Sequence, residues 1–270
     1  MHYTTKEPIC LLEALAHLAP ESSKNTLRGW LRDGRVAVDG TLQRKPALQL
    51  RRGQEITVAS KQKKEGPLRI LYEDAHLVVI DKPTGLLSVA TDFETQRTAH
   101  AILKKRYYPK KVYVIHRLDQ ETSGVMCFAL SEVAYHFLKA ELAQHKVQRH
   151  YEGRVEGKLE GKGVWVAYLE EDKNYYMHSS QDPTRGERAV THYEAIAYDP
   201  AKDQTRVAFQ LETGKKNQIR VHAKDAGHPL VGDTKYGGSD AKRLYLHAKK
   251  LVFIHPITHK EVTVESVSGL

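Results

Sequence analysis

Residues 112–130 read VYVIHRLDQETSGVMCFAL, and the pattern is apolar, then polar, then apolar. The runs at 112–115 and 125–130 are short and apolar, which predicts two strands joined by a polar connector. Because a strand holds each end of the connector, a carboxylate on it is fixed in place while it faces a cleft. Asp119 is therefore a candidate catalytic residue. The alternative is an ordinary turn aspartate that hydrogen-bonds to nearby backbone.

Similar short apolar runs occur on both sides of this segment, at residues 77–80, 188–197, 206–211 and 251–254. Helical spacing is rarer. Its clearest example follows Ser131, where four apolar residues share one face: Val133, Phe137, Leu138 and Leu142. Strands with few helices between them predict an α+β domain with a mixed, largely antiparallel β-sheet and flanking helices.

A second polar segment, residues 211–222, runs from a predicted strand into a predicted helix. On that helix Asn217, Arg220 and Lys224 fall on one polar stripe, so we expect Arg220 to point away from the core. If Arg220 reached Asp119, the charge-assisted pair would keep the carboxylate ionised and fix its orientation. A structural salt bridge or a phosphate contact would explain an exposed arginine equally well.

The N-terminal region has its own pattern. Two helical stretches, near residues 11–18 and 24–34, lead into a short β-prone run with the hairpin signal Asp39-Gly40. Over residues 9–58 this order resembles the alpha-L RNA-binding motif of small ribosomal proteins and RNA-modifying enzymes. A helix-hairpin cap without an RNA-binding role is the alternative. We expect RNA contacts from the basic residues along and just after the second helix: Lys24, Arg28, Arg32 and Arg35.

A linker is predicted at residues 61–67, which are polar and basic and lack periodicity. The chain is thereby divided into a small N-terminal helix-hairpin RNA-binding domain, residues 1–60, and a catalytic domain, residues 68–270. Basic charge gathers before this boundary. Residues 24–64 hold eleven Lys/Arg and three Asp/Glu, which is most of the net charge of +9. A localised basic surface favours a polyanionic partner.

The composition excludes several classes of protein. With 40% hydrophobic and 28% charged residues, the 270-residue chain is typical of a globular protein. No apolar run approaches the roughly 18 residues of a membrane span, and no secretory signal is recognisable, so we expect a cytoplasmic location. Cys10 and Cys127 lie far apart, and the histidines lack the spacing of a helical zinc pair, so neither a disulfide framework nor a metal site is expected.

The connector carries a recognisable motif. Residues 116–124, HRLDQETSG, resemble the signature H-R-L-D-x-x-T-S-G of the RluA-type pseudouridine synthases. Four more landmarks of that family occur in the same order: the opening strands at 71–85, Arg149-His150-Tyr151, the segment 213–222, and the closing strands at 244–256. The sequence departs from the family at Lys215 and Asn217, which replace a common arginine and histidine, and at Arg149, which replaces a common lysine.

The resemblance implies isomerisation of uridine to pseudouridine in structured rRNA or tRNA. The bond from the sugar to nitrogen 1 of a flipped-out uracil breaks, and the sugar rejoins carbon 5 with no atom gained or lost, so we expect no nucleotide, metal or other cofactor. It implies that Asp119 is the catalytic group, as nucleophile or as base, that Arg220 keeps it ionised, and that Tyr151 stacks on the base and is a candidate for the final proton removal. We expect a monomer that contacts RNA through Arg117, Lys216 and Asn217.

Two other functions share part of this pattern. A catalytically vestigial RNA-binding or ribosome-assembly protein would explain the basic N-terminal region, but the intact Asp119, Tyr151 and Arg220 argue against it. A base-excising glycosidase would also use a flipped base and a carboxylate. Hydrolytic glycosidases generally use two carboxylates, whereas isomerisation needs a site that excludes water, since water captured at the sugar would leave an abasic site.

Overall fold

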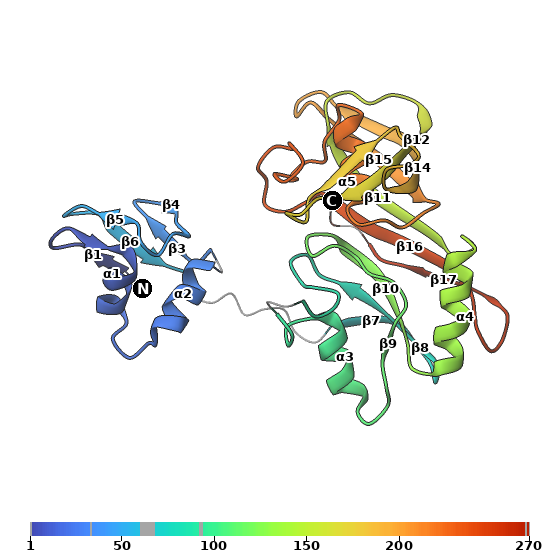
Figure 1. Cartoon of the computed structure of the whole chain (residues 1–270), viewed down its shortest axis with the longest axis horizontal. Helices are drawn as coiled ribbons and strands as arrows, with labels where there is room; N and C mark the ends of the chain where they lie inside the picture. The colour runs from blue at the N-terminus through green and yellow to red at the C-terminus, as the bar shows by residue number, and fades with distance from the viewer. Residues whose placement is uncertain (1, 33, 60–67, 92–93, 268, 270) are drawn as a thin grey trace. The chain divides into compact units, whose positions relative to one another are not determined.

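A computed structural model describes residues 2–32, 34–59, 68–91, 94–267 and 269. The chain divides into two compact units, Met1–Gly66 and Pro67–Leu270 (Figure 1). The linker predicted at residues 61–67 lies outside the described residues. Within the ranges given above, no helix combines the length and the apolar character that crossing a membrane requires.

The N-terminal unit contains two short helices followed by a hairpin. Helix α1 is Leu11–Leu18 and helix α2 is Lys24–Arg32, and the Ser23 hydroxyl caps α2 by accepting a hydrogen bond from the backbone N–H of Thr26 at 3.2 Å. Strands β3 and β4, Val36–Val38 and Thr41–Leu42, pair antiparallel across Asp39 and Gly40. Both turn residues have positive φ, as a two-residue type I′ hairpin requires.

Two small sheets complete this unit, with strand order β1-β6-β3-β4 in one and β2-β5 in the other. Their remaining strands are β1 (His2–Thr4), β2 (Ile9–Cys10), β5 (Gln49–Leu50) and β6 (Glu55–Val58). The apolar faces of both helices meet the sheet in a core of their own, which includes Leu15, Leu27, Leu31 and Ile56.

The second unit is built on one sheet, eleven-stranded in the described part of the chain, with the order β13-β12-β14-β15-β11-β16-β10-β8-β7 and with β17 beside β16 and β9 beside β10. The strands are β7 (Arg69–Glu73), β8 (Leu77–Lys82), β9 (Tyr113–Val114), β10 (Ser123–Ala129), β11 (Gln148–Glu156), β12 (Lys162–Glu171), β13 (Met177–Ser180), β14 (Glu187–Asp199), β15 (Gln204–Leu211), β16 (Leu246–Ile254) and β17 (Glu261–Glu265). Only β10 and β16 pair parallel among these neighbours. The prediction of a mixed, largely antiparallel sheet is confirmed.

The parallel pair joins two halves of the sheet, and Figure 1 shows β10 and β8 on one side of β16, with β11, β15 and β14 on the other. The pairing is short, with Ser123 opposite His247 and Gly124 opposite Ala248. Gly124 has a φ of 112°, and a Cβ there would lie 2.2 Å from the carbonyl oxygen of Ala248. Only glycine fits both the backbone conformation and the close approach at this position.

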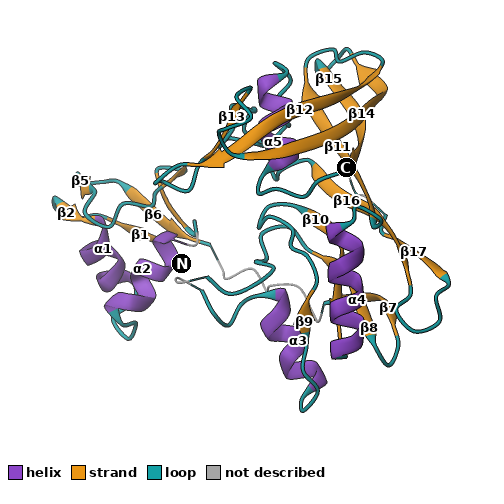
Figure 2. Cartoon of the chain, turned by 45° about the vertical axis from the view of Figure 1, so that its right-hand side comes forward, coloured by secondary structure: helices purple, strands orange, loops and turns teal. Residues whose placement is uncertain are grey.

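Helices cover both faces of the half that contains β8 and β10 (Figure 2). Successive residues of these strands alternate between two cores: Val78 and Phe128 share one with helix α3 (Ala99–Tyr107), whereas Val79 and Cys127 share the other with helix α4 (Glu132–Ala143). Strands buried on both faces explain why this part of the sequence reads as continuous apolar runs.

The predicted apolar face of α4 is wrong at one residue. Ser131 caps the helix, as its hydroxyl accepts from the N–H of Ala134 at 3.4 Å, but Val133 is 63% exposed. The buried residues are Ala134 and Leu138. The contact face of the helix is therefore the one that carries Ala134 and Leu138, and Val133 lies outside it.

Candidate active site

A cavity of about 1370 Å³ opens in the second unit between the connector that precedes β10, strand β11, and the loop before helix α5 (Gln218–Asp225). The structure brings together at this cavity the three predicted catalytic residues and two of the predicted RNA contacts: Asp119, Tyr151, Arg220, Arg117 and Lys216. These residues come from segments that are distant in the sequence.

Asp119 lies on the connector between β9 and β10, and hydrogen bonds to the backbone on either side of it fix its position. The Ser88 hydroxyl donates to the carbonyl of Leu118 at 2.6 Å and accepts from the N–H of Leu118 at 3.0 Å. After Asp119, the N–H of Gly85 donates to the carbonyl of Gln120 at 2.8 Å. The backbone that carries the carboxylate is therefore anchored to the loop after β8.

Lys82, at the end of β8, is the strongest of these anchors. Its side chain is completely buried, and Nζ donates to the carbonyl oxygens of Leu86 at 2.7 Å, Gln120 at 3.0 Å and Pro83 at 3.1 Å. Burial lowers the pKa of Lys82 to about 7, although the negative charge of Asp119 acts in the opposite direction. This buried side chain thus ties β8 to the connector at Gln120, the residue that follows the candidate carboxylate.

Tyr151 is held by β11 at an irregularity in the sheet. The pairing of β11 with β16 shifts register between His150 and Tyr151, and such a bulge re-aims a side chain. The Tyr151 side chain is 8% exposed and lines the cavity. Burial raises the pKa of Tyr151 to about 12, so the phenol is neutral at physiological pH.

Arg220 does not point into solvent, and the predicted polar stripe on its helix is wrong. All residues from Gln218 to Ala223 are buried, and Arg220 is 6% exposed. The reason is that α5 packs against β12, β13 and β14, while the loop that contains Asp233 covers the polar side of the helix. Of the predicted stripe, Lys224 is exposed.

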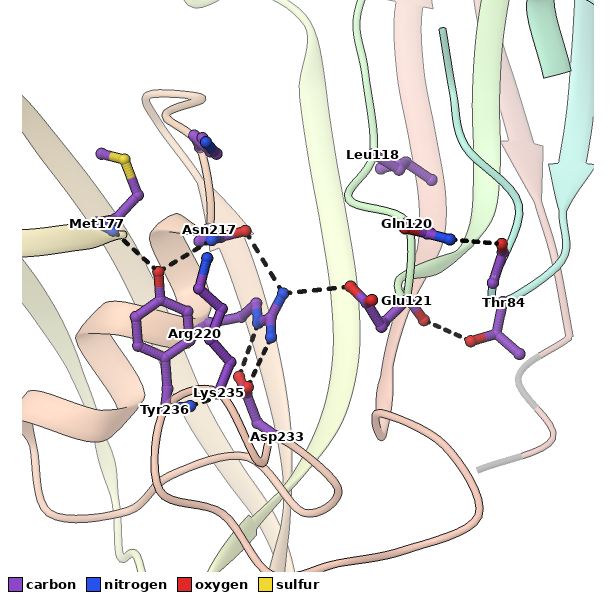
Figure 3. Close-up of polar contacts among 12 residues, drawn as sticks. Thr84, Leu118, Gln120, Glu121, Met177, Asn217, Arg220, Asp233, Lys235 and Tyr236 are labelled. Carbon is purple, nitrogen blue, oxygen red and sulfur yellow. Dashed lines mark hydrogen bonds and ion pairs between the residues drawn. The ribbon is translucent and has the colours of Figure 1, made fainter. Parts of the chain in front are cut away.

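The guanidinium of Arg220 is fixed by a buried carboxylate. Its Nε and Nη2 donate to the two oxygens of Asp233 at 2.8 and 2.7 Å, and Nη1 donates to Glu121 at 3.5 Å (Figure 3). The guanidinium also lies over the ring of Tyr236, 5.1 Å from its centroid. In the described residues the ion pairs of Arg220 are with Asp233 and Glu121. Arg220 therefore affects Asp119 through its positive charge, without an ion pair between the two.

The charge state of Asp119 is set by opposing effects. Burial raises the pKa of this carboxyl above its ordinary value, and the neighbouring Glu121 raises it further. Arg220 and Lys82 lower it through their positive charge, in that order of strength. The sequence-based expectation that Arg220 favours the ionised form has the correct direction, but burial outweighs it.

The remaining predicted RNA contacts differ in placement. Arg117 is exposed at the cavity, and Lys216 forms an ion pair with Glu171 and lies 5.5 Å from the centroid of the Tyr175 ring. Asn217 is only 6% exposed, and its side-chain amide lies between Asp119 and Tyr236.

In the N-terminal unit, Lys24, Arg28 and Arg32 have exposed side chains on α2. Arg35 is half-buried. Its Nη2 and Nε donate to the carbonyl of Ala59 at 2.9 and 3.1 Å, and its guanidinium lies 5.2 Å from the centroid of the Trp30 ring. Arg35 therefore contributes to the structure of this unit through contacts of its own.

Sequence reasoning missed three residues that build the site. Lys82 binds the connector that carries Asp119, and Tyr236 binds Asn217. Asp233 fixes Arg220. A signal existed for Lys82, because a lysine at the end of a strand that begins with four apolar residues needs acceptors if it is buried. For Asp233 there was no local signal, since it lies in a turn whose pattern says nothing about an arginine on the preceding helix.

Comparison with known proteins agrees with this geometry. A family model described as RNA pseudouridylate synthase matches residues 76–225, more than half of the chain. A ribosomal large subunit pseudouridine synthase D from Vibrio cholerae is 32% identical over an alignment of 282 residues. The alignment covers 93% of this chain and 85% of that protein. An uncharacterised RNA pseudouridine synthase of Bacillus subtilis is 34% identical over 220 residues, covering 79% and 72%.

The fold is also that of a solved structure. Human RNA pseudouridylate synthase domain-containing protein 1 superposes with a TM-score of 0.62 at 24% identity, over 74% of this chain and 83% of that one. Fold and sequence thus define an isomerase that acts on RNA. The chain belongs to the RNA pseudouridylate synthase family, and the resemblance to its RluA-type members is confirmed. The reaction is the conversion of uridine to pseudouridine in RNA.

Proposed function

We propose that this enzyme modifies uridine in ribosomal RNA and that Asp119 is its catalytic carboxylate. The RNA class is supported by the relative from Vibrio cholerae, a ribosomal large subunit enzyme that matches nearly the whole chain. The observation that carries the assignment of Asp119 is its place at the cavity, on a backbone anchored before and after it, with Tyr151 and Arg220 at the same cavity.

The other carboxylates at the cavity support this choice. Glu171 forms an ion pair with Lys216, and Glu187 forms one with Lys215. Asp119 forms no ion pair within the described ranges and lines the cavity, where a bound substrate can reach it. As a nucleophile or as a base toward the sugar, Asp119 acts in its charged form, which Arg220 and Lys82 favour.

Tyr151 is suited to hold the uracil ring. A buried, neutral phenol presents an aromatic face, and stacking of a base on such a face contributes about 1–3 kcal/mol. Because the pKa of about 12 leaves little phenolate at neutral pH, its surroundings favour stacking over the role of a resting base in the final proton removal.

The size of the cavity fits a nucleotide that has left its stack. At about 1370 Å³ it exceeds the roughly 1,000 Å³ of a large small-molecule pocket. It therefore has room for a flipped nucleotide and part of its neighbours. Arg117, exposed beside Asp119, is placed to occupy the vacated position or to bind the backbone.

The N-terminal unit is proposed to recruit the RNA. Its exposed basic residues on α2, followed by a hairpin, match the expected alpha-L type domain. We propose that the enzyme acts in the cytoplasm as a monomer and without a nucleotide or metal cofactor.

Mapping of pseudouridine in ribosomal RNA and tRNA tests the proposal. Cells that lack the protein should lose modification at one or a few uridines, and the wild-type gene should restore it. Asp119→Asn should not restore it, whereas Asp225→Asn, which changes an exposed carboxylate on α5, should. Restoration by Asp119→Asn would overturn the catalytic assignment, and loss confined to tRNA would overturn the RNA class.

A further inference from the structure

Asn217 lies between Tyr236 and Asp119, at the N-terminal end of α5. Its backbone is left-handed, with φ 53° and ψ 21°, a conformation that asparagine adopts more readily than most residues with a side chain. The side chain is nearly inaccessible, so its amide must find partners within the protein.

The orientation of the Asn217 amide follows from its neighbours. With Nδ2 toward Asp119, that nitrogen lies 2.9 Å from Oδ2 and 3.2 Å from Oδ1, and the amide oxygen lies 2.9 Å from the Tyr236 hydroxyl. Figure 3 shows the contacts of the opposite orientation, which gains a 3.5 Å hydrogen bond from Arg220 but sets two acceptor oxygens against each other. The first orientation satisfies both ends of the amide and is the favourable one.

The Tyr236 hydroxyl supports the same orientation. This side chain is 1% exposed, and its oxygen accepts a hydrogen bond from the N–H of Met177 at 3.2 Å. Burial raises the pKa of Tyr236, so the phenol keeps its proton, and that proton needs an acceptor. In the described part of the chain, only the Asn217 amide oxygen is placed to accept it.

The result is a chain of hydrogen bonds with one direction. Met177 N–H donates to Tyr236, the Tyr236 hydroxyl donates to Asn217, and the Asn217 amide donates to both oxygens of Asp119. A carboxylate accepts at both oxygens, whereas a protonated carboxyl does so less well, so this chain favours the charged form.

We propose that Asn217, oriented by Tyr236, is the positioning residue that sets the rotation of the Asp119 carboxylate and favours its ionised form. The inference rests on the proposed catalytic role of Asp119. Within the described residues, Arg220 donates to Asp233 and Glu121 and not to Asp119, so it acts on this carboxylate through its charge.

Other charges face Asp119 from each surrounding element: Lys82 at the end of β8, Glu121 on its own connector, Tyr151 on β11, Arg220 on α5 and Lys235 on the following loop. None of them donates a hydrogen bond to the carboxylate in the described residues. The backbone N–H of Asn217 also donates to Asp119, and both variants keep it. Loss of the oriented side-chain amide should therefore shift the titration of Asp119 while the backbone donor and these charges stay in place.

The pH dependence of pseudouridine formation, measured with the full-length enzyme on its target RNA, tests the proposal. Tyr236→Phe removes one buried oxygen, and Asn217→Asp keeps the shape and the left-handed backbone but sets a second carboxylate against Asp119. Tyr236→Phe leaves the amide without the donor that orients it, and Asn217→Asp removes the amide. In both variants Asp119 thus loses its oriented side-chain donor, so the acidic limb of kcat should move to higher pH by about one unit, as expected when a charged group loses a hydrogen bond. At neutral pH kcat should fall roughly tenfold to a hundredfold, with KM unchanged.

Tyr176→Phe is the matched control, because its hydroxyl donates to the carbonyl of Lys235 at 3.1 Å and its ring packs against Tyr236. Its acidic limb should coincide with that of the wild type. Thermal unfolding will show whether Asn217→Asp folds. If it does not, the acidic limb of kcat in Tyr236→Phe still tests the proposal.

An acidic limb that stays in place in Tyr236→Phe would overturn the proposal, whether or not kcat falls, because a merely structural role lowers kcat equally at every pH. Asp119→Asn, assayed alongside, separates the two hypotheses. If Asp119→Asn is active, the catalytic assignment itself fails. If it is inactive and the limb of Tyr236→Phe is unmoved, only the role of Asn217 fails.

Discussion

The guanidinium of Arg220 is bound at two positions by Asp233, at 2.7 and 2.8 Å, and not by Asp119. Asp233 is itself 1% exposed, so the pair is withdrawn from water. The arginine therefore acts on Asp119 as a fixed positive charge whose position another carboxylate determines. An incoming substrate can approach Asp119 without first breaking an ion pair.

Replacement of Asp233 should be severely destabilising. Asp233→Asn would leave a buried guanidinium without its counter-charge, and we expect the free energy of unfolding to fall by about 3–5 kcal/mol. Urea denaturation at neutral pH measures this change. Asp225→Asn, at the exposed end of α5, is the control and should remain within about 0.5 kcal/mol of the wild type. An equally small effect for Asp233→Asn would contradict the structural role of the pair.

Asp119→Asn should be more stable than the wild-type enzyme at neutral pH. Burial raises the pKa of Asp119 above 3.8, so the folded state binds this proton at a pH at which the unfolded chain has released it. The resulting stability is present below the ordinary pKa and is lost as the pH rises through the folded value. We expect a gain in the free energy of unfolding at pH 7 that disappears under acidic conditions. Equal stability of the two proteins at pH 7 would argue against it.

Tyr151 should contribute to RNA binding through its ring. In an Asp119→Asn background, where turnover is blocked, Tyr151→Phe should bind the target RNA as the parent does. Tyr151→Ala should bind more weakly by about 1–3 kcal/mol, the usual contribution of one stacked base. Filter binding or fluorescence anisotropy gives both dissociation constants. A Phe variant as weak as the Ala variant would assign the affinity to the hydroxyl instead.

Lys82 should make stability depend on pH above neutrality. Its pKa is about 7 in the folded protein, whereas the unfolded chain holds the proton up to the ordinary value of 10.5. Between these values the unfolded state binds more protons, so stability rises with pH. Lys82→Met should remove this rise and leave the carbonyl oxygens of Leu86 and Pro83 unpaired, at a cost of about 1–3 kcal/mol for each unsatisfied group.

The measurement for Lys82 is urea denaturation at pH 7 and pH 9. The gap between the wild type and Lys82→Met should be wider at pH 9. Lys104→Met, at an exposed site on α3, should show the same difference from the wild type at both values. A gap that does not change with pH would show that the buried ammonium does not titrate in this range.

The basic side of α2 should contribute to the salt dependence of RNA binding. Replacing Lys24, Arg28 and Arg32 by glutamine should reduce the slope of log K against log salt by about two, since each phosphate contact contributes roughly 0.7–0.9. A control variant replaces three exposed lysines of the second unit that lie outside the cavity lining: Lys158, Lys173 and Lys202. Equal slopes in the two triple variants would exclude a recruiting role for α2.

The sequence predicted the strands whose buried residues follow one another as an apolar run. Strands β8 and β10 read as apolar runs because both of their faces are covered. Strand β11 has no such run although it lies in the middle of the sheet. It carries Glu152, which is 6% exposed and forms ion pairs with Lys249 and Arg206 on neighbouring strands. Partners that distant cannot be identified from the polar stretch itself.

The candidate site shows the same limit. Asp119 could be found because its motif is contiguous, whereas the environment of Arg220 depends on which loop covers α5. Helical spacing alone put Arg220 on a solvent face, but the loop that contains Asp233 makes that face an interior one. Such long-range packing decides whether a polar side chain meets water or a counter-ion.

The narrow junction between β10 and β16 has a mechanical consequence. Asp119 belongs to one half of the sheet and Tyr151 to the other, and two residue pairs, including Gly124 with Ala248, connect the halves along the ladder. A methyl group on Gly124 would collide with the backbone of Ala248 at this junction. The relative placement of Asp119 and Tyr151 thus depends on a backbone contact that is too close to admit even a methyl group.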